Sequence, residues 1–328
     1  MVPRLHYPRL QPSNFERIQS IMHKVSILHL LTSAKNASPF DVNMAVDAGY
    51  EQIMPYTSVA LDEVVALTQD AMFSRSTSTK QGLSGVQREA LFFGGRDIHL
   101  SLAMQKLAKN TMFKPFEVST MADPSGAFTT AAAMLAIIDK HLRANQQTFN
   151  QQTIAIFGAT GTVGGTAALI AASLGAKVML VAHKDVQQMQ IYAQTLQEKY
   201  AIDVEVADGT SDQAKTAILQ IANIAICAAA AGVRALESAH FVQSSTLKIM
   251  ADVNAVAPSG IDGVGVNSNG DTILGTQIAS FGALAIGDLK YKTQQRLLQN
   301  MLKSEVALHI GYEQAFKTAQ SFLIPLSV

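Results

Sequence analysis

Short apolar runs alternate with segments of helical periodicity through the first half of the chain. The runs that predict β-strands are residues 25–31, 52–56, 90–93 and 115–119. Helices are predicted between and after them, over residues 39–48, 61–73, 97–109 and about 124–142. Ser38 supplies the N-cap of the first helix, Pro39 its first position and Gly49 its C-cap. This alternation predicts a parallel open sheet flanked by helices.

The second half of the chain repeats the alternation. Strands are predicted over residues 153–157, 177–182, 202–207, 224–228 and 247–252. Helices are expected over residues 163–174, 185–200, 211–220 and 234–243, and again over 292–302 and 312–322. The glycine-rich stretch 258–275 is predicted to be a long loop. This order is typical of a doubly wound, Rossmann-type domain, so the predicted fold class is α/β with two open α/β domains.

A polar, glutamine-rich segment, 143–152, marks the boundary between the two domains. We predict a substrate-binding domain made of residues 25–143 together with about 290–328, and a nucleotide-binding domain of residues 144–289. Residues 1–24 are rich in arginine and proline and lack the apolar core of a secretory signal, which indicates an added N-terminal extension.

A glycine-rich turn over residues 158–165 is the clearest nucleotide-binding signal. It follows an apolar strand and opens an apolar helix, and its glycines have the spacing G-x-x-G-x-x-G. Such a turn places the pyrophosphate of a dinucleotide on backbone N–H groups at the helix N-terminus. No Gly-Lys-Ser/Thr follows, which disfavours phosphoryl transfer. The predicted cofactor contacts in the turn are Gly158, Thr160, Gly161, Thr162, Val163 and Gly164.

The end of the second strand in this unit bears on the choice of nucleotide. NAD-specific proteins carry Asp or Glu there, but this chain has His183 and Lys184. These side chains would attract a 2′-phosphate, which favours NADP and leaves NAD possible. The competing interpretation is that Lys184 is a solvated residue at a helix start, with Asp185 beside it.

Composition narrows the range of partners. The 328 residues are 48% hydrophobic and 15% charged, with a formal net charge of zero, so no overall field favours nucleic acid or a membrane surface. No apolar run approaches the roughly 20 residues of a membrane helix, and a cytoplasmic location is expected. The single cysteine, Cys227, is expected in the core. The apolar excess fits a subunit interface, so we expect a homo-oligomer, and no metal site is predicted.

Several longer motifs resemble a known family. They occupy residues 38–50, 92–95, 122–133, 251–261 and 281–292, with the sequences SPFDVNMAVDAGY, FFGG, ADPSGAFTTAAA, ADVNAVAPSGI and FGALAIGDLKYK. In these segments the chain resembles the NAD(P)-dependent methylene-tetrahydromethanopterin dehydrogenases of methylotrophic bacteria, and the resemblance runs over about residues 25–303. Because that family begins close to Val25, the resemblance makes Met22 a candidate for the true start of the protein.

The resemblance implies a reaction in one-carbon metabolism, on the route of formaldehyde oxidation. Hydride leaves the one-carbon bridge between two nitrogens of methylene-tetrahydromethanopterin and goes to C4 of the nicotinamide, which produces a methenyl cation. No proton is abstracted, so no general base is required and little pH dependence from a base is expected. Positioning and electrostatics must supply most of the catalysis, with carboxylates facing the new cation and Lys or Arg binding the anionic pterin tail.

Polar residues in these motifs are the candidates for substrate and catalytic contacts. The predicted catalytic residues are Lys290, as the cation that orients the substrate, and Asp123. Two residues at strand ends, Ala229 and Asn254, are added to the cofactor contacts, because ligands gather at the carboxyl ends of parallel strands. The predicted substrate-binding residues are Asp41, Asn43, Asp47, Gly95 and Asp97.

The charged candidates also have structural interpretations. Asp41 lies three residues after Ser38, in a position that resembles a capping box. Asp47 fits an exposed helix end, and Asp123 fits a cap of the long helix that follows it. Lys290 follows a glycine-containing turn, where a lysine is often solvated.

Three rival functions fit parts of the pattern. A methylene-tetrahydrofolate dehydrogenase acts on the same reacting bicycle, and a shikimate-type NADP dehydrogenase has the same domain order but transfers a proton at a lysine or aspartate. A non-catalytic NADP-binding redox sensor needs no pterin pocket, so turnover of a pterin separates it from an enzyme. Short-chain reductases are disfavoured because the chain contains no Tyr-x-x-x-Lys.

Overall fold

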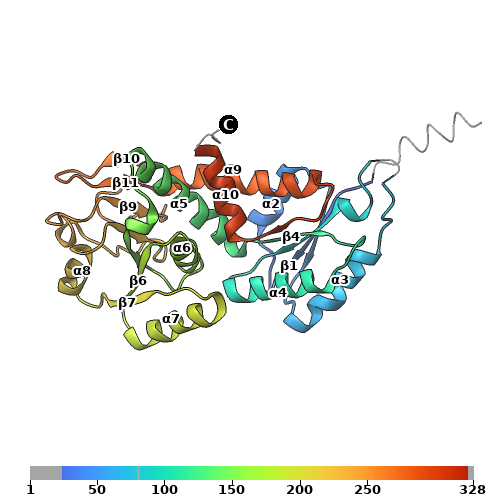
Figure 1. Cartoon of the computed structure of the whole chain (residues 1–328), viewed down its shortest axis with the longest axis horizontal. Coiled ribbons are helices and arrows are strands. Elements are labelled where there is room, and N and C mark those ends of the chain that lie inside the picture. The colour runs from blue at the N-terminus through green and yellow to red at the C-terminus, as the bar shows by residue number, and fades with distance from the viewer. Residues whose placement is uncertain (1–23, 80–81, 324–328) are drawn as a thin grey trace, which may run out of the picture.

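Two open sheets form the core of the computed structural model, which describes residues 24–79 and 82–323 (Figure 1). The first sheet has the order β12-β4-β3-β1-β2, and all its strand pairs are parallel. Its strands are β1 (Ile27–Leu31), β2 (Gln52–Tyr56), β3 (Glu89–Phe93), β4 (Ser119–Ala122) and β12 (His309–Ile310). The helices that follow β1, β2 and β3 are α2 (Pro39–Ala48), α3 (Val64–Phe73) and α4 (Ile98–Thr111).

The second sheet has the order β10-β11-β9-β8-β5-β6-β7. Its strands are β5 (Thr153–Phe157), β6 (Lys177–Ala182), β7 (Glu205–Asp208), β8 (Ile224–Cys227), β9 (Ile249–Asp252), β10 (Asn269–Thr272) and β11 (Ala279–Phe281). Helices α6 (Thr162–Ser173), α7 (Val186–Tyr200) and α8 (Asp212–Leu219) follow β5, β6 and β7. The predicted α/β class, with two open sheets and a Rossmann-type second sheet, is confirmed.

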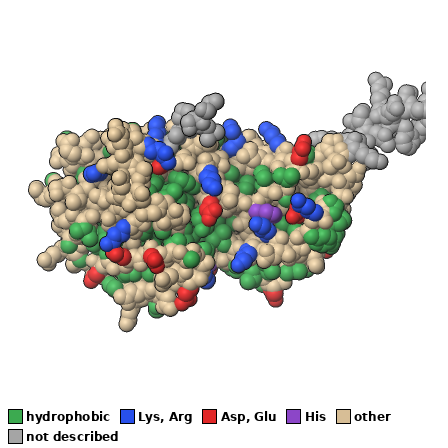
Figure 2. Space-filling model, viewed as in Figure 1, with side chains coloured by type: hydrophobic (Ala, Val, Ile, Leu, Met, Phe, Trp, Pro, Cys, Tyr) green, Lys and Arg blue, Asp and Glu red, His purple; other side chains and the backbone are tan. Residues whose placement is uncertain are grey.

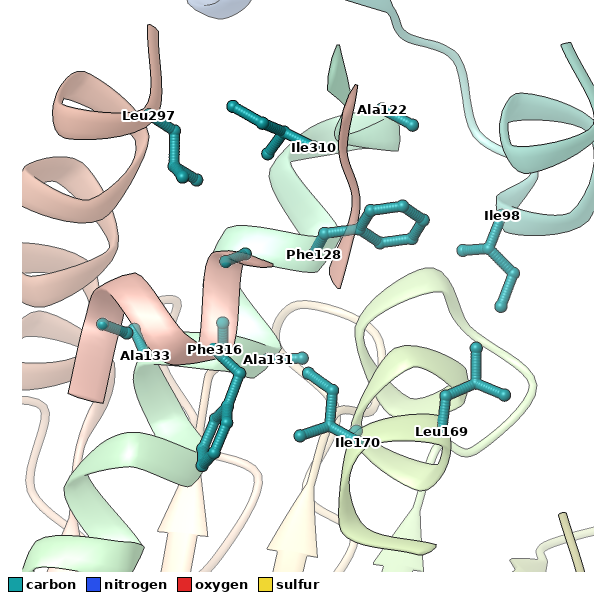
Figure 3. Packing of buried hydrophobic residues seen from close by; sticks show 14 of the residues in the cluster. Ile98, Ala122, Phe128, Ala131, Ala133, Leu169, Ile170, Leu297, Ile310 and Phe316 are labelled. Carbon is teal, nitrogen blue, oxygen red and sulfur yellow. The ribbon is translucent and has the colours of Figure 1, made fainter. Parts of the chain in front are cut away.

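Helix α5 (Ala127–Ala144) lies between the two halves of the molecule (Figure 1). From Ala127 to Ile138 every residue except Thr130 is buried. A helix that is buried on all sides needs small and apolar residues all round, which explains its alanine-rich sequence. Helices α6, α9 (Ala283–Lys303) and α10 (Tyr312–Leu323) pack against it, as Figure 3 shows for a cluster that includes side chains of all four helices.

The helix predicted over 234–243 is wrong. The structure has only a single 3-10 turn there, Ser238–His240. The N–H groups of Ala235 and Leu236 both donate to the Gly260 carbonyl. This pairing with a segment distant in sequence holds the chain extended, so tertiary hydrogen bonds override the helical periodicity.

Two further segments differ from the prediction. The strand expected over 115–119 is displaced, since β4 begins at Ser119, and Pro115 has no N–H to give to a ladder. The predicted loop 258–275 contains β10, which pairs antiparallel with β11 at the edge of the second sheet. An exposed edge strand needs no apolar run, so hydrophobic periodicity did not reveal it.

Helix α9 begins at Ala283 rather than at Lys292. Gly282 provides its N-cap, and Gly287 lies inside the helix, where a glycine costs about 1 kcal/mol relative to alanine. Because glycine is common in turns, the sequence predicted a turn in this segment. As a consequence Lys290 does not follow a turn but lies within α9, on its buried side.

Two other predictions concern single features of the chain. Cys227 is buried at the end of β8, as predicted, and burial raises the pKa of its thiol to about 12. Within residues 24–79 and 82–323, no helix is both long and apolar enough to cross a bilayer. The predicted extension 1–24, with Met22, lies outside the described residues except for Lys24.

Candidate functional site

The first crevice lies at the carboxyl ends of β1 and β3. The chain leaves β1 for β2 on one side and later forms β3 on the other, so the strand order reverses between β1 and β3. Ligands of open α/β sheets bind outside the strand ends at such a reversal. A pocket of about 330 Å³ opens here, and its lining includes Thr32, Ser38, Phe40, Asp41, Arg96 and Ser125.

Three ionisable side chains meet beside this pocket from three different elements. Asp41 lies in the first turn of α2, Asp123 follows β4, and Lys290 lies within α9. All three are buried, with exposed fractions of 3%, 0% and 8% respectively. We call these three residues the charged cluster.

Several contacts fix the ammonium of Lys290. Its Nζ atom lies 3.5 Å from the centroid of the Phe40 ring and donates to Gln294 Oε1 at 2.6 Å. Burial lowers the pKa of Lys290, while the carboxylates of Asp123 and Asp41 oppose that shift. Lys290 is therefore held by a cation–π contact, a hydrogen bond and the attraction of two acids.

The Asp123 carboxylate is fully engaged in hydrogen bonds. Its Oδ1 accepts from the N–H groups of Phe128 at 2.8 Å and Thr129 at 3.2 Å, and its Oδ2 accepts from Thr129 Oγ1 at 2.6 Å. These N–H groups are unpaired donors of the first turn of α5, so Asp123 caps that helix. Burial raises the pKa of Asp123, and Lys290 and these hydrogen bonds lower it.

Asp41 differs because one of its oxygens is without a partner. Among the described residues, none donates a hydrogen bond to its buried Oδ1. In the cap of α2 it is the backbone N–H of Asp41 that donates, to Ser38 Oγ at 3.5 Å. Burial raises the pKa of Asp41 to about 7; Asp123 adds to this shift and Lys290 opposes it. Asp41 is thus the acid of the cluster that can accept from a ligand.

The loops after β3 and β4 are tied together at the pocket. Ser125 Oγ donates to the Gly95 carbonyl at 2.8 Å. Ser125 and Gly126 have φ angles of 55° and 65°, a left-handed conformation that is unfavourable for the serine. A Cβ atom on Gly126 would lie 3.0 Å from Lys290 Nζ, so this glycine leaves space for the ammonium.

The remaining predicted substrate residues are not brought together with the cluster. Gly95 lines the pocket, whereas Asn43 and Asp47 are exposed on α2 and do not line it. Successive helical residues are rotated by about 100°, so Asn43 points away from the side of Asp41. Asp47 Oδ2 instead accepts a hydrogen bond from Tyr291 OH at 3.3 Å.

Asp97 has a structural position as well. Its Oδ1 accepts from the N–H groups of His99 at 2.8 Å and Leu100 at 3.1 Å. It is therefore the N-cap of α4, and this role accounts for an acid at that point of the sequence. Its neighbour Arg96 is the residue that lines the pocket.

The second crevice lies at the carboxyl ends of β5 and β8, where the order of the second sheet reverses. Gly158 follows β5 with a φ of 79°, and a Cβ atom on it would lie 2.5 Å from the Ala228 carbonyl. A Cβ atom on Gly164 would lie 2.3 Å from the Gly158 oxygen. Gly161 is the N-cap of α6, and its N–H donates to that same oxygen at 3.1 Å. Glycine is needed at 158 and 164 for the turn to close this tightly.

Free backbone donors gather at this turn. The hydrogen bond from the Gly165 N–H to the Gly161 carbonyl closes the first turn of α6. The N–H groups of Thr162, Val163 and Gly164 precede it and have no acceptor within the helix. Together with the positive end of the helix dipole, such donors favour a bound anion, and Thr160 is exposed in the same turn. These residues fit the pyrophosphate of a dinucleotide.

His183 and Lys184 are exposed at the carboxyl end of β6. The neighbouring Asp185 carboxylate accepts from the Gln188 N–H at 3.0 Å and is the N-cap of α7. Asp185 is therefore engaged by the helix, and two basic side chains stand at the strand end where NAD-specific proteins have an acid.

The two remaining candidates for cofactor contacts, Ala229 and Asn254, differ in what they contact within the protein. Ala229 follows β8, and its nitrogen would lie 2.7 Å from a Cβ atom on Gly158, so it borders the glycine turn. Asn254 is buried, and its Nδ2 donates to the Pro258 carbonyl at 3.2 Å. Its Oδ1 accepts from the Val256 N–H at 3.0 Å. The Asn254 side chain thus stabilises its own loop.

Comparisons with known proteins identify the family of this chain. The family described as "Methylene-tetrahydromethanopterin dehydrogenase, N-terminal" matches residues 39–125. The "NAD(P)-dependent methylenetetrahydromethanopterin dehydrogenase" of Methylorubrum extorquens is 40% identical over 295 residues, which cover 90% of this chain and 97% of that protein. The chain belongs to the methylenetetrahydromethanopterin dehydrogenase family. The resemblance inferred from the motifs is confirmed.

Two other proteins are similar to this methylenetetrahydromethanopterin dehydrogenase family member. The "Bifunctional protein MdtA" of Methylorubrum extorquens is 29% identical over 297 residues, covering 86% of this chain and 94% of that protein. A crystal structure of shikimate 5-dehydrogenase from Listeria monocytogenes covers 90% of this chain and 97% of its own, with 13% identity and a TM-score of 0.44.

The pocket residues of this methylenetetrahydromethanopterin dehydrogenase that were missed from the sequence include Phe40, Arg96 and Ser125. The sequence did offer a signal for Phe40, because a large aromatic residue in the first turn of a helix and directly before an acid is a poor candidate for the core. The structure leaves this side chain 44% exposed. Arg96 gave no signal of its own, because an arginine beside an acid is usual on a solvated surface. Ser125 has a positive φ, which only the backbone reveals.

Proposed function

We propose that this dehydrogenase transfers a hydride from the methylene bridge of methylene-tetrahydromethanopterin to NADP or NAD and leaves a methenyl cation on the pterin. This is the activity in the name of the Methylorubrum extorquens relative, and it is a step of one-carbon metabolism on the route of formaldehyde oxidation. The bound nicotinamide supplies the hydride acceptor at C4. No residue of the chain is required to abstract a proton.

The charged cluster is the observation that carries this proposal. With all three groups ionised, two carboxylates and one ammonium leave one net negative charge in a buried site. A fixed negative charge stabilises a cation that forms beside it, and burial strengthens the attraction because less water screens it. The pterin gains its positive charge only as the hydride leaves. The cluster therefore binds the transition state more tightly than the substrate, which is the condition for catalysis.

The residues of the cluster have different roles in this proposal. Asp41 lines the pocket and has an unpartnered oxygen, so it is the carboxylate that faces the pterin. Lys290 orients the substrate with its ammonium. Asp123 is a positioning residue rather than a catalytic one, because both of its oxygens are occupied by the first turn of α5. Asp123 thereby fixes the site of Lys290.

Two further side chains complete the substrate pocket. Phe40 is 44% exposed and offers an aromatic face on which a flat pterin ring can stack. Arg96 is exposed at the pocket, and no acid among the described residues pairs with it. An unpaired guanidinium suits the anionic groups of the pterin tail. Asn43, Asp47 and Asp97 are left without a substrate contact in this proposal.

The preference for NADP rests on the end of β6. His183 and Lys184 are both exposed there, and the acid that follows them is engaged as a helix cap. A 2′-phosphate at this position meets two basic side chains and no free carboxylate on the same segment. We propose NADP as the preferred acceptor and NAD as the weaker one.

One spectrophotometric experiment tests the proposed function. The formation of NADPH or NADH is followed after methylene-tetrahydromethanopterin is added, and kcat/KM is compared for both nucleotides. Methylene-tetrahydrofolate is tested in parallel. Absence of turnover with either pterin overturns the enzyme interpretation in favour of a nucleotide-binding sensor. Turnover with the folate alone moves the assignment to the rival dehydrogenase.

Two properties of the protein, its location in the cell and its oligomeric state, are proposed from the sequence alone. We propose a homo-oligomer, because the chain has a large apolar fraction and little charge. We propose a cytoplasmic location, because no apolar run of the sequence approaches the length of a membrane helix. Light scattering of the purified protein measures its mass in solution. A monomer of 35.1 kDa contradicts the homo-oligomer.

A further inference from the structure

A basic pocket lies at the joint between the two sheets, apart from both crevices. Its volume is about 480 Å³, within the range of small-molecule sites, and it is lined by α4, the end of α7, β12 and the start of α10. Helix α4 packs on the first sheet and α7 on the second, so the pocket spans both halves. Figure 2 shows Lys and Arg side chains, and a His, on the face between the two halves.

The lining of this pocket is strongly unbalanced in charge. Lys106, Lys109 and Lys199 line it together with His309, and the one acid of the lining is Glu313. None of the three lysines forms an ion pair with any residue that the structure describes. Ammonium groups from two different helices around one pocket repel one another, and a bound anion would remove that cost.

Two histidines of the first half lie close enough to these lysines for their pKa values to be affected. Burial lowers the pKa of His309, and Lys109 lowers it further, while Glu117 opposes the shift. Burial and Lys199 likewise lower the pKa of His99, which Asp97 opposes. A lysine on α4 and a lysine on α7 therefore both lower the pKa of a histidine in the first half.

Neutral donors accompany the lysines. His309 Nδ1 lies 3.0 Å from Thr120 Oγ1. The other ring nitrogen of His309, Nε2, has no hydrogen-bond partner among the residues that the structure describes. At the start of α10 the Gly311 N–H is occupied, since it donates to Gln314 Oε1 at 2.9 Å. The three lysines and the histidine are the basic side chains of the site.

We propose that this pocket binds a small dianion, namely inorganic phosphate or the phosphate group of a monoester, between α4 and α7. The structural alternative is that Lys109 and Lys199 merely complement helix dipoles, because each lies in the last turn of its helix. That alternative does not account for Lys106, which lies three residues before Lys109 and on the same side of α4. An anion held by all three lysines ties the two halves together.

Calorimetric titration of the full chain with phosphate tests this proposal. The titration is done at saturating NADP, so that the glycine turn and Lys184 cannot take the phosphate, and sodium chloride at equal ionic strength is the blank. We expect saturable binding to the wild type and at least about tenfold weaker binding to the Lys109→Gln, Lys199→Gln double variant. The single variant Lys106→Gln is expected to weaken binding as well.

Lys303→Gln is the matched control, because Lys303 is exposed and lies in the last turn of α9, outside the pocket. It should bind phosphate as the wild type does and should also keep the rise of Tm that phosphate produces. No saturable binding to the wild type overturns the proposal. So does equal binding by the wild type and Lys106→Gln, which serves if the double variant does not fold.

Discussion

The Nζ atom of Lys290 lies 3.5 Å from the centroid of the Phe40 ring. This contact joins α9, near the end of the chain, to the first turn of α2. Phe40 lines the pocket, and the ammonium of Lys290 lies over its ring and close to Asp41 and Asp123. The ammonium is therefore placed at the pocket by a residue that itself belongs to the proposed pterin site.

Replacing Lys290 tests this arrangement. We expect Lys290→Gln to lower kcat by about a hundredfold, because the substrate loses its orienting cation, and to leave the Kd of NADP unchanged. Lys292→Gln is the matched control, since Lys292 is exposed on the same helix and pairs with Asp288 at 2.7 Å. Steady-state kinetics and a nucleotide titration measure both quantities. A similar loss in the two variants would place the effect in the helix instead of the cluster.

The pKa of Asp41, raised to about 7, predicts a pH dependence of catalysis. The carboxylate is the form that stabilises the methenyl cation, so kcat/KM is expected to rise as the pH increases through about 7. This dependence arises from electrostatics and not from a general base. Asp41→Asn should lower kcat/KM at high pH and flatten the profile. An unchanged step in the Asp41→Asn profile would assign it to another group.

Asp41→Asn should also change stability, with a sign opposite to that of most acids. The native pKa of about 7 exceeds the unfolded value of about 3.9, so the native state holds a proton that the unfolded state releases between these pH values. Stability from this group is present below that window and is lost as the pH rises through it. We expect Asp41→Asn to raise the free energy of unfolding by about 2 kcal/mol at about pH 8 and to change it little at about pH 4. Urea unfolding at the two pH values measures this, and destabilisation at the higher pH would refute it.

Charge reversal at Lys184 tests the choice of nucleotide. We expect Lys184→Glu to lower kcat/KM for NADP by about tenfold or more and to affect NAD much less, because only NADP carries a 2′-phosphate. Lys177→Glu, at the opposite end of β6, is the control and should leave both values near the wild type. An equal effect of Lys184→Glu on both nucleotides contradicts the assignment.

Replacing Gly164 by alanine tests whether the glycine turn requires a residue without a side chain at this position. Its Cβ atom would lie 2.3 Å from the Gly158 oxygen, so the backbone must move, and we expect the Kd of NADP to rise by about tenfold or more. The comparison is Gly287→Ala, inside α9, whose Cβ atom would meet nothing within 4 Å. That change should raise stability by about 0.5–1 kcal/mol through helix propensity. Fluorescence titration with NADPH and thermal unfolding measure the pair.

Arg96 is expected to bind the tail of the pterin. Arg96→Gln should raise the KM for methylene-tetrahydromethanopterin by about tenfold with little change in kcat, because the tail lies away from the reacting bridge. Lys35→Gln is the control, since its neighbours Ala34 and Asn36 line the pocket but Lys35 does not. If the two variants raise KM equally, the effect is one of general charge.

Hydrophobic periodicity predicted the buried strands well and the exposed segments poorly. The bounds of β5 and β6 agree with the prediction, because strands covered on both faces need continuous apolar runs. The segment 234–243 has helical periodicity, but its backbone bonds to the Gly260 carbonyl instead. That partner lies in another loop, so no local pattern reports it.

The sequence by itself determined the alternation of strands and helices, the family and the nucleotide turn. These features depend on neighbouring residues, as in the spacing of Gly158, Gly161 and Gly164. Only the tertiary structure decided which acid is free, since the donors that occupy Asp123 belong to the folded start of α5 while Asp41 Oδ1 meets none among the described residues. It also decided that Lys290 faces inward. Burial and its effect on charge depend on segments that are distant in sequence, and folding alone brings these together.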